Sequence, residues 1–111
     1  GKVVIGVDVD QSKESETVIT SAMKNLGDSV YGAIDNFYQD KFEGGVSVVL
    51  DASTNGIQLP METSKFKTFN QADYDKIYAG LKDGSIKVEK DTVAEDADKV
   101  PAEIVTVENI K

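Results

Sequence analysis

Residues 2–11 read KVVIGVDVDQ, an apolar run that ends on carboxylates. Apolar residues without alternation, mostly β-branched, are typical of a strand buried on both faces, as in the centre of a parallel sheet between helices. Such sheets bind their ligands at the carboxyl ends of the strands. Asp8 would therefore stand where a carboxylate can accept hydrogen bonds from the hydroxyl groups of a ligand.

The composition limits both the size of the fold and its chemistry. With 111 residues, 40% of them apolar, the chain can form a single domain around one modest core. Cysteine and histidine are both absent, which removes disulfide bonds, thiolate chemistry, the usual neutral-pH base and the commonest metal ligand. We therefore expect neither enzyme activity nor a cofactor.

The charge distribution argues against a nucleic-acid partner. All 12 basic residues are lysines, and the 20 acidic residues give the chain a net charge of −8. This field repels phosphate backbones, and no arginine is present to make a bidentate contact with a base. No apolar segment reaches the roughly 20 residues that cross a bilayer, and no leader pattern begins the chain, so we expect a soluble piece. Composition does not identify its compartment.

The first half of the chain predicts a strand followed by a long helix. Residues 17–20 are a short β-branched run, which favours a strand. Beyond it, apolar residues recur at steps of three and four, which predicts a helix from about Ser21 to Lys41 that buries one stripe. The glycine pair at 44 and 45 would end it. The stripe comprises Met23, Leu26, Val30, Ile34 and Phe37.

The second half predicts a hairpin and another helix. Residues 46–50 and 56–60 are two apolar runs joined by a turn-forming segment, which indicates a β-hairpin. Asn70 and Asp73 have the spacing of a helix N-cap and its capping box, and Gly84 suits the C-terminal position. The buried side of this second helix would comprise Tyr74, Ile77, Tyr78 and Leu81.

The chain as a whole reads as a single α/β unit over residues 1–111, with a mainly parallel sheet and flanking helices. Residues 89–100 are acids, lysines and small residues, which predicts a mobile acidic stretch. Residues 103–107 alternate well enough for an edge strand, which could pair within the chain or with another.

Asp8 and Lys24 are the candidate ligand-binding residues. If the first two strands are neighbours, a carboxylate acceptor and an ammonium donor could approach one point. The alternatives are that Asp8 caps the following turn and that Lys24 is a surface lysine. A metal loop starting at Asp8 and Asp10 fits poorly, because its sixth position, where glycine is needed, is Lys13. We expect no metal site.

Several segments in order resemble the basic membrane protein family of substrate-binding lipoproteins. They are residues 4–11, 18–24, 28–34, 41–45 and 55–59. The resemblance implies part of a type I periplasmic-binding-protein fold, in which two α/β lobes linked by three chain crossings close on a ligand. The chain resembles only the C-terminal part of such a protein.

The resemblance also implies a function outside the cell membrane. Family members bind nucleosides, especially purine nucleosides, and deliver them to an ABC transporter permease, and Asp8 and Lys24 match the positions that hold the ribose hydroxyls. The full-length protein would be extracytoplasmic and lipid-anchored, with the anchor absent from this chain. The remaining lobe would be a partner, and surfaces normally covered by it would favour self-association. The alternative is a sensory or protein-interaction module with the same fold and no transport role.

Overall fold

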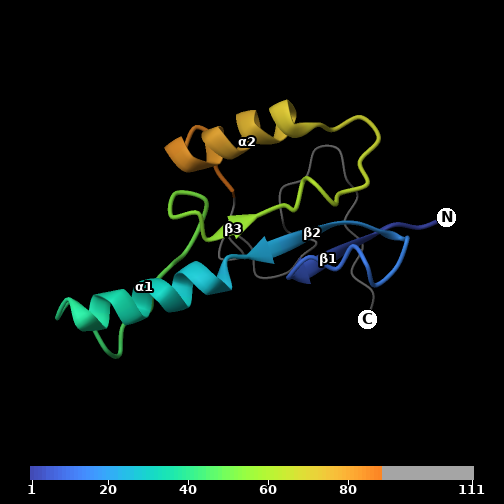
Figure 1. Cartoon of the computed structure of the whole chain (residues 1–111). Coiled ribbons are helices and arrows are strands. Elements are labelled where there is room, and N and C mark those ends of the chain that lie inside the picture. The colour runs from blue at the N-terminus through green and yellow to red at the C-terminus, as the bar shows by residue number, and fades with distance from the viewer. Residues whose placement is uncertain (89–111) are drawn as a thin grey trace, which may run out of the picture.

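The computed structural model describes residues 1–88, so the expectations for residues 89–100 and 103–107 lie outside the described part. Within it, three strands and two helices follow one another along the chain (Figure 1). They are β1 (Val4–Asp8), β2 (Val18–Lys24), α1 (Leu26–Tyr38), β3 (Ile57–Gln58) and α2 (Gln71–Asp83). The predicted α/β class is confirmed.

The three strands form a mixed sheet in the order β1-β2-β3. β1 and β2 are parallel, with Gly6 opposite Ser21 and Asp8 opposite Met23. β3 is short and runs antiparallel to the end of β2. Because β1 and β2 are adjacent and parallel, their carboxyl ends meet at one edge of the sheet.

The predicted start of the first helix is wrong by about one turn. Residues 21–24 continue β2 as a strand, and α1 begins only at Leu26 and ends at Tyr38, before the glycine pair. The physical reason is pairing: β1 offers partners as far as Asp8, and this ladder overrides the helical spacing of Met23. Lys24 therefore closes a strand and does not begin a helix.

The predicted hairpin is also wrong, although its turn is present. The N–H of Gly56 donates to the carbonyl of Asp51 at 2.7 Å, and Asn55 has a left-handed φ of 56°. β3, however, pairs with the end of β2, which supplies an ordered strand edge. The N–H of Asn25, just after β2, donates to the carbonyl of Gly56, just before β3, at 2.9 Å. This bond holds the two strands side by side. Residues 46–50 form no strand pair within the described part of the chain.

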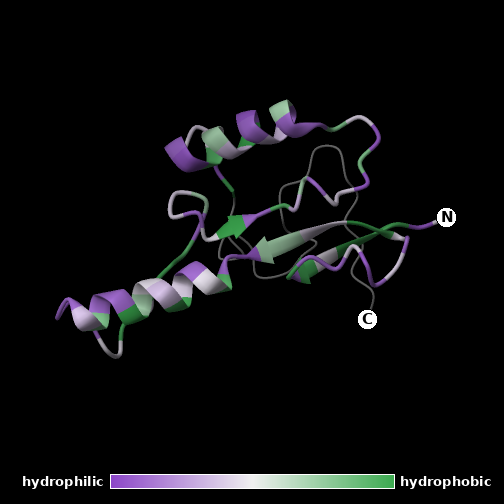
Figure 2. Cartoon of the chain, in the orientation of Figure 1, coloured by the Kyte–Doolittle hydropathy of each residue, from purple (hydrophilic) through white to green (hydrophobic). Residues whose placement is uncertain are grey.

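The apolar surfaces predicted to be buried are largely exposed. No residue of α1 is buried, and Val4, Ile5 and Val7 of β1 are 49–63% exposed. Among residues 1–88 the buried core is small. It consists of the apolar Val18 and Ala52, the polar Thr20 and Ser21, and the glycines Gly6 and Gly80. Figure 2 shows hydrophobic stretches along β1 and α1, and Figure 1 shows α1 projecting from the sheet. These faces lack a covering layer within residues 1–88.

The second helix begins and ends as predicted. The side chain of Asn70 accepts from the N–H groups of Ala72 and Asp73, at 2.9 and 3.2 Å, and the Asp73 carboxylate accepts from the N–H of Asn70 at 3.1 Å. Gly84 follows the helix with a left-handed φ of 78°. These local bonds satisfy main-chain groups that a helix end leaves unpaired, so the boundaries depend little on the rest of the fold.

Two tyrosines attach α2 to β3. The hydroxyl of Tyr78 donates to the carbonyl of Ile57 at 2.8 Å, and the N–H of Leu59 donates to the hydroxyl of Tyr74 at 3.3 Å. Burial raises the pKa of Tyr78, which keeps this donor protonated. Of the four residues predicted to form the buried face, Ile77 is 44% exposed and the others are half-buried.

Candidate functional site

The structure brings the two candidate residues together at the carboxyl edge of the sheet. Asp8 ends β1, Lys24 ends β2, and Lys24 Nζ lies 2.7 Å from Asp8 Oδ1. The side chains remain open to solvent, 50% for Asp8 and 61% for Lys24. The predicted convergence is confirmed, and it arises because the two strands are parallel neighbours.

Asp8 has a strained backbone conformation. Its φ is 71°, and the N–H of Val9 donates to the carbonyl of Val7 at 2.9 Å across it. A hydrogen bond from residue i+2 to residue i around a positive φ defines a γ-turn of the rarer, strained kind. A non-glycine residue in this region costs on the order of 1 kcal/mol, and such strain is common at functional sites.

The carboxylate of Asp8 is not used to cap the loop after β1. Oδ1 is shielded from solvent and has no hydrogen-bond partner among residues 1–88; the contact with Lys24 is an ion pair outside hydrogen-bond alignment. The cap is made by Asp10, whose Oδ1 accepts from the N–H of Ser12 at 2.9 Å. Within residues 1–88 the capping alternative for Asp8 is therefore wrong, and its side chain is 50% exposed.

A tight polar contact fixes the end of β1 behind Asp8. The side-chain oxygen of Gln11 accepts from the N–H of Val7 at 3.2 Å, and the N–H of Gln11 donates to the Oγ of Ser21 at 3.0 Å. Ser21 is completely buried. The loop therefore folds back on the strand pair, and this contact holds the γ-turn at Asp8 in place.

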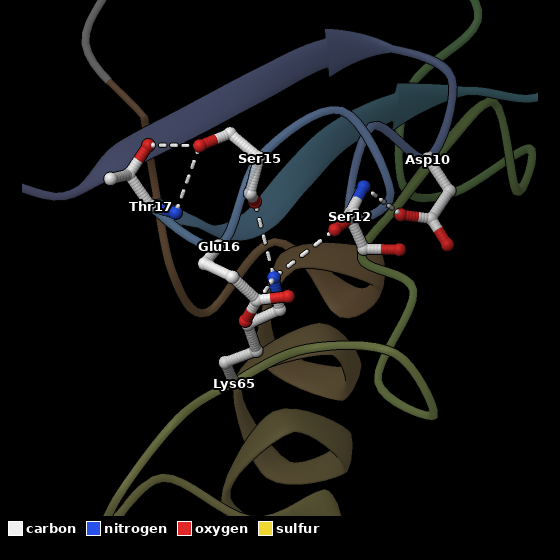
Figure 3. A network of polar contacts seen from close by, with 6 residues as sticks. All are labelled: Asp10, Ser12, Ser15, Glu16, Thr17 and Lys65. Carbon is white, nitrogen blue, oxygen red and sulfur yellow. Dashed lines mark hydrogen bonds and ion pairs between the residues drawn. The ribbon is translucent and has the colours of Figure 1, made fainter.

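A second network, shown in Figure 3, ties the same loop to a distant part of the chain. The ammonium of Lys65 donates to the carbonyls of Ser12 and Ser15 at 3.1 and 3.2 Å, and lies 3.6 Å from the Glu16 carboxylate. The N–H of Lys65 also donates to the carbonyl of Ile19 in β2 at 2.7 Å. Lys65 thus joins the loop to the sheet.

Thr63 adds a further contact to this loop, and it controls the titration of Asp10. Its hydroxyl donates to Asp10 Oδ2 at 2.6 Å. This bond, followed by the N–H of Ser12, lowers the pKa of Asp10 from its ordinary value of 3.8, because both donors stabilise the ionised carboxylate. Sequence reasoning missed Thr63 and Lys65, since no local pattern indicates a contact between residues so far apart along the chain.

The variant Thr63→Val is expected to raise the pKa of Asp10, because it removes the strongest donor to the carboxylate. A carboxyl group whose pKa is lowered in the folded state stabilises the fold at pH values above its unfolded pKa, here 3.8. This contribution is lost as the pH falls through the folded pKa. The stability difference between the wild type and the variant should therefore shrink as the pH falls below that value. Carboxyl NMR titration measures the pKa directly, with Thr68→Val as the control. An unchanged Asp10 titration would contradict the contact.

Beside Lys24, an apolar groove of about 490 Å³ runs between the sheet and α2. The rings of Tyr74 and Tyr78 lie in its wall with centroids 5.4 Å apart, and both hydroxyls are engaged with β3 or the residue after it. They therefore serve to attach the helix.

Within residues 1–88, no three acidic side chains gather as a metal site. Neither α1 nor α2, the helices of this described part, has the length and hydropathy that a membrane span requires.

Comparison with known proteins identifies one family. A family model described as "ABC transporter substrate-binding protein PnrA-like" (Bmp) matches residues 1–90. The match includes both strands that carry Asp8 and Lys24 and the loop between them. No curated protein matches the chain.

Proposed function

The chain belongs to the Bmp family of ABC transporter substrate-binding proteins, and from that premise we propose that it forms one wall of a nucleoside site. Its preferred ligands would be purine nucleosides, held by the ribose. The observation that carries the proposal is the pair of Asp8 and Lys24, a carboxylate and an ammonium 2.7 Å apart at the carboxyl edge of the sheet.

The chemistry of this pair matches two adjacent hydroxyl groups. A sugar hydroxyl both donates and accepts, so the Asp8 carboxylate can accept from one group while the Lys24 ammonium donates to its neighbour. Charged partners make such bonds shorter and stronger than neutral ones. The side chains are half-exposed, so a ligand can reach them. The pair would thus recognise the ribose and leave the base to other residues.

The net charge supports a neutral ligand. A chain with a charge of −8 repels anions, so a nucleoside would be favoured over its phosphorylated form. The one cation of the pair, Lys24, is already neutralised by Asp8 at 2.7 Å. We therefore expect nucleoside monophosphates to bind less tightly than nucleosides.

The exposure of the pair supports a two-walled site. One side of a hydroxyl clamp gives little affinity once the cost of immobilising the ligand is counted. A second lobe closing over Asp8 and Lys24 would exclude water and strengthen both polar contacts. In this proposal the chain is the C-terminal part of a two-lobed, lipid-anchored, extracytoplasmic protein that passes its ligand to a transporter permease.

Calorimetry tests the proposal on the 111-residue chain and on a longer polypeptide that contains both lobes. The titrants are guanosine, adenosine, inosine, ribose and guanosine 5′-monophosphate. We expect the two-lobed protein to bind the nucleosides, with the monophosphate at least about tenfold weaker, and the shorter chain to bind weakly. Binding by neither protein would contradict the proposal and favour the protein-interaction alternative.

A further inference from the structure

The turn before β3 contains the pair Asn55 and Gly56, and Asn55 is the one asparagine of the chain that precedes a glycine. The geometry of the turn requires both residues. Asn55 has a left-handed φ of 56°, which asparagine tolerates better than most residues. A Cβ on Gly56 would lie 2.6 Å from the main-chain carbonyl carbon of Leu50, so a larger residue does not fit there. The fold therefore places an asparagine directly before a glycine.

This pair is chemically reactive. Glycine carries no side chain, so its main-chain nitrogen can approach the side-chain amide of the residue before it. Attack of that nitrogen on the amide carbon closes a small imide ring. Asn55 is exposed, so water can reach such a ring and open it.

The closed turn holds both reacting groups in other contacts. The N–H of Gly56, which would have to lose its proton, donates to the carbonyl of Asp51 at 2.7 Å. The side-chain oxygen of Asn55 accepts from the ammonium of Lys82 at 3.2 Å. The hydroxyl of Thr54 reinforces the turn, since it accepts from the N–H of Asp51 at 3.0 Å and donates to the Asp51 carbonyl at 3.1 Å. Ring closure therefore requires the turn to open.

We propose that Asn55 is a site of spontaneous deamidation, protected in the closed turn and reactive when the turn opens. The main-chain nitrogen of Gly56 gives up its proton and forms a bond to Cγ of Asn55, while the bond from Cγ to Nδ2 breaks. The amide nitrogen leaves as ammonia with that proton, and a succinimide remains. Water then opens the succinimide at one of its two carbonyls, which gives aspartate or isoaspartate at position 55.

The two products have opposite effects on the turn. Aspartate keeps the main chain intact, tolerates the left-handed φ, and places a carboxylate where the ammonium of Lys82 already lies. Isoaspartate routes the main chain through the former side chain and adds one carbon to it. The carbonyl of Asn55, which accepts from the side chain of Asn25 at 3.3 Å, then becomes a free carboxylate.

Isoaspartate would loosen the strand end that carries Lys24. The lengthened chain displaces Gly56, whose carbonyl accepts from the N–H of Asn25 at 2.9 Å. This bond lies beside the pairing of Lys24 with Ile57, and β3 has two residues to hold it there. β3 would therefore separate from β2.

Peptide mapping by mass spectrometry tests the proposal on the 111-residue chain, incubated at mildly alkaline pH in buffer and in concentrated urea. A reaction that needs an opening follows the population of the open form, so Asn55 should react at least about tenfold more slowly in buffer than in urea. In both conditions it should react before the other asparagines, none of which precedes a glycine. Asn55→Gln should suppress the reaction, because the longer side chain forms a less favourable ring.

Thr54→Val separates protection by the turn from reactivity of the pair itself. It removes both bonds of the Thr54 hydroxyl to Asp51. Deamidation in buffer should therefore accelerate by about threefold or more, because the turn opens more often, while the rate in urea stays unchanged. The matched control is Thr68→Val, the same substitution at an exposed position outside the turn, which should change neither rate.

Hydrogen exchange identifies the product that opens the sheet. The N–H of Asn25 should lose protection in the isoaspartate form and keep it in Asn55→Asp, which reproduces the other product. The proposal is overturned if Asn55 reacts equally fast in buffer and in urea, if another asparagine reacts first, or if Thr54→Val behaves as Thr68→Val does. Equal protection of Asn25 in the isoaspartate form and in Asn55→Asp would refute the effect on β3.

Discussion

Gly6→Ala is expected to destabilise the chain by about 2–4 kcal/mol, because the new methyl group has no room between β1 and β2. A Cβ at this position would lie 2.5 Å from Ser21 Oγ and 2.6 Å from the side-chain oxygen of Gln11. Ser21 cannot move freely, since it is fully buried and its Oγ accepts from the N–H of Gln11. The Cβ of Gln11, at 2.9 Å, is a second obstacle. The substitution therefore overpacks the strand pair and breaks a hydrogen bond behind Asp8.

Chemical denaturation followed by circular dichroism measures this effect. The matched control is Gly32→Ala in α1, where an added Cβ would meet no atom within 4 Å. Alanine there should leave stability unchanged or improve the helix by up to about 1 kcal/mol. Equal denaturation midpoints for the two variants would show that Gly6 is not confined as the structure places it.

The elements that could be predicted from the sequence are those fixed by neighbouring residues. Asn70, Asp73 and Gly84 mark the ends of α2 through bonds between near neighbours and through one left-handed glycine. β1 could be recognised because its apolar run has no alternation. The meeting of Asp8 and Lys24 followed from a single topological assumption, that the first two strands are parallel neighbours.

What could not be predicted depends on partners distant in sequence. Met23 fits the spacing of a helical stripe, yet it belongs to β2 because Asp8 of β1 lies opposite it. Residues 57–58 could pair with either of two runs, and only the bond from Asn25 to Gly56 shows that β2 is the partner. The contacts of Thr63 and Lys65 with the loop after β1 leave no local pattern.

Asp8→Gly in the two-lobed protein is expected to abolish most of the ribose recognition while leaving the fold as stable as before, or more stable. Glycine adopts a φ of 71° without the steric cost that aspartate has, which offsets the entropy that glycine loses on folding. The ligand, however, would lose the carboxylate that accepts from its hydroxyl group. A charged hydrogen bond in a closed site contributes about 1.5–3 kcal/mol, which is roughly tenfold to a hundredfold or more in affinity.

The 2′-deoxynucleoside makes this prediction specific to the ribose. In the wild-type protein, the missing hydroxyl should weaken binding by about 1–3 kcal/mol, since a buried polar group of the protein is left unpaired. In Asp8→Gly, removing the 2′-hydroxyl should lower the affinity little, because the carboxylate that would accept from this hydroxyl is already absent. Asp8→Asn replaces the carboxylate with an amide of nearly the same shape, and asparagine also tolerates the left-handed backbone. This variant removes the charge but keeps one acceptor oxygen, so its affinity should fall between those of the wild type and Asp8→Gly.

A double-mutant cycle with Lys24→Met then distinguishes a binding pair from a structural one. If the ion pair at 2.7 Å only stabilised the edge of the sheet, removing either partner would lower the denaturation midpoint and affect ribo- and deoxyribonucleosides equally. Pairs this exposed contribute about 1 kcal/mol or less to stability, so the midpoint should change little. The coupling between Asp8 and Lys24 should therefore appear in the affinity for ribonucleosides and largely disappear for the deoxy form. Coupling of equal size for both ligands would assign the pair to the fold and leave the ribose without these partners.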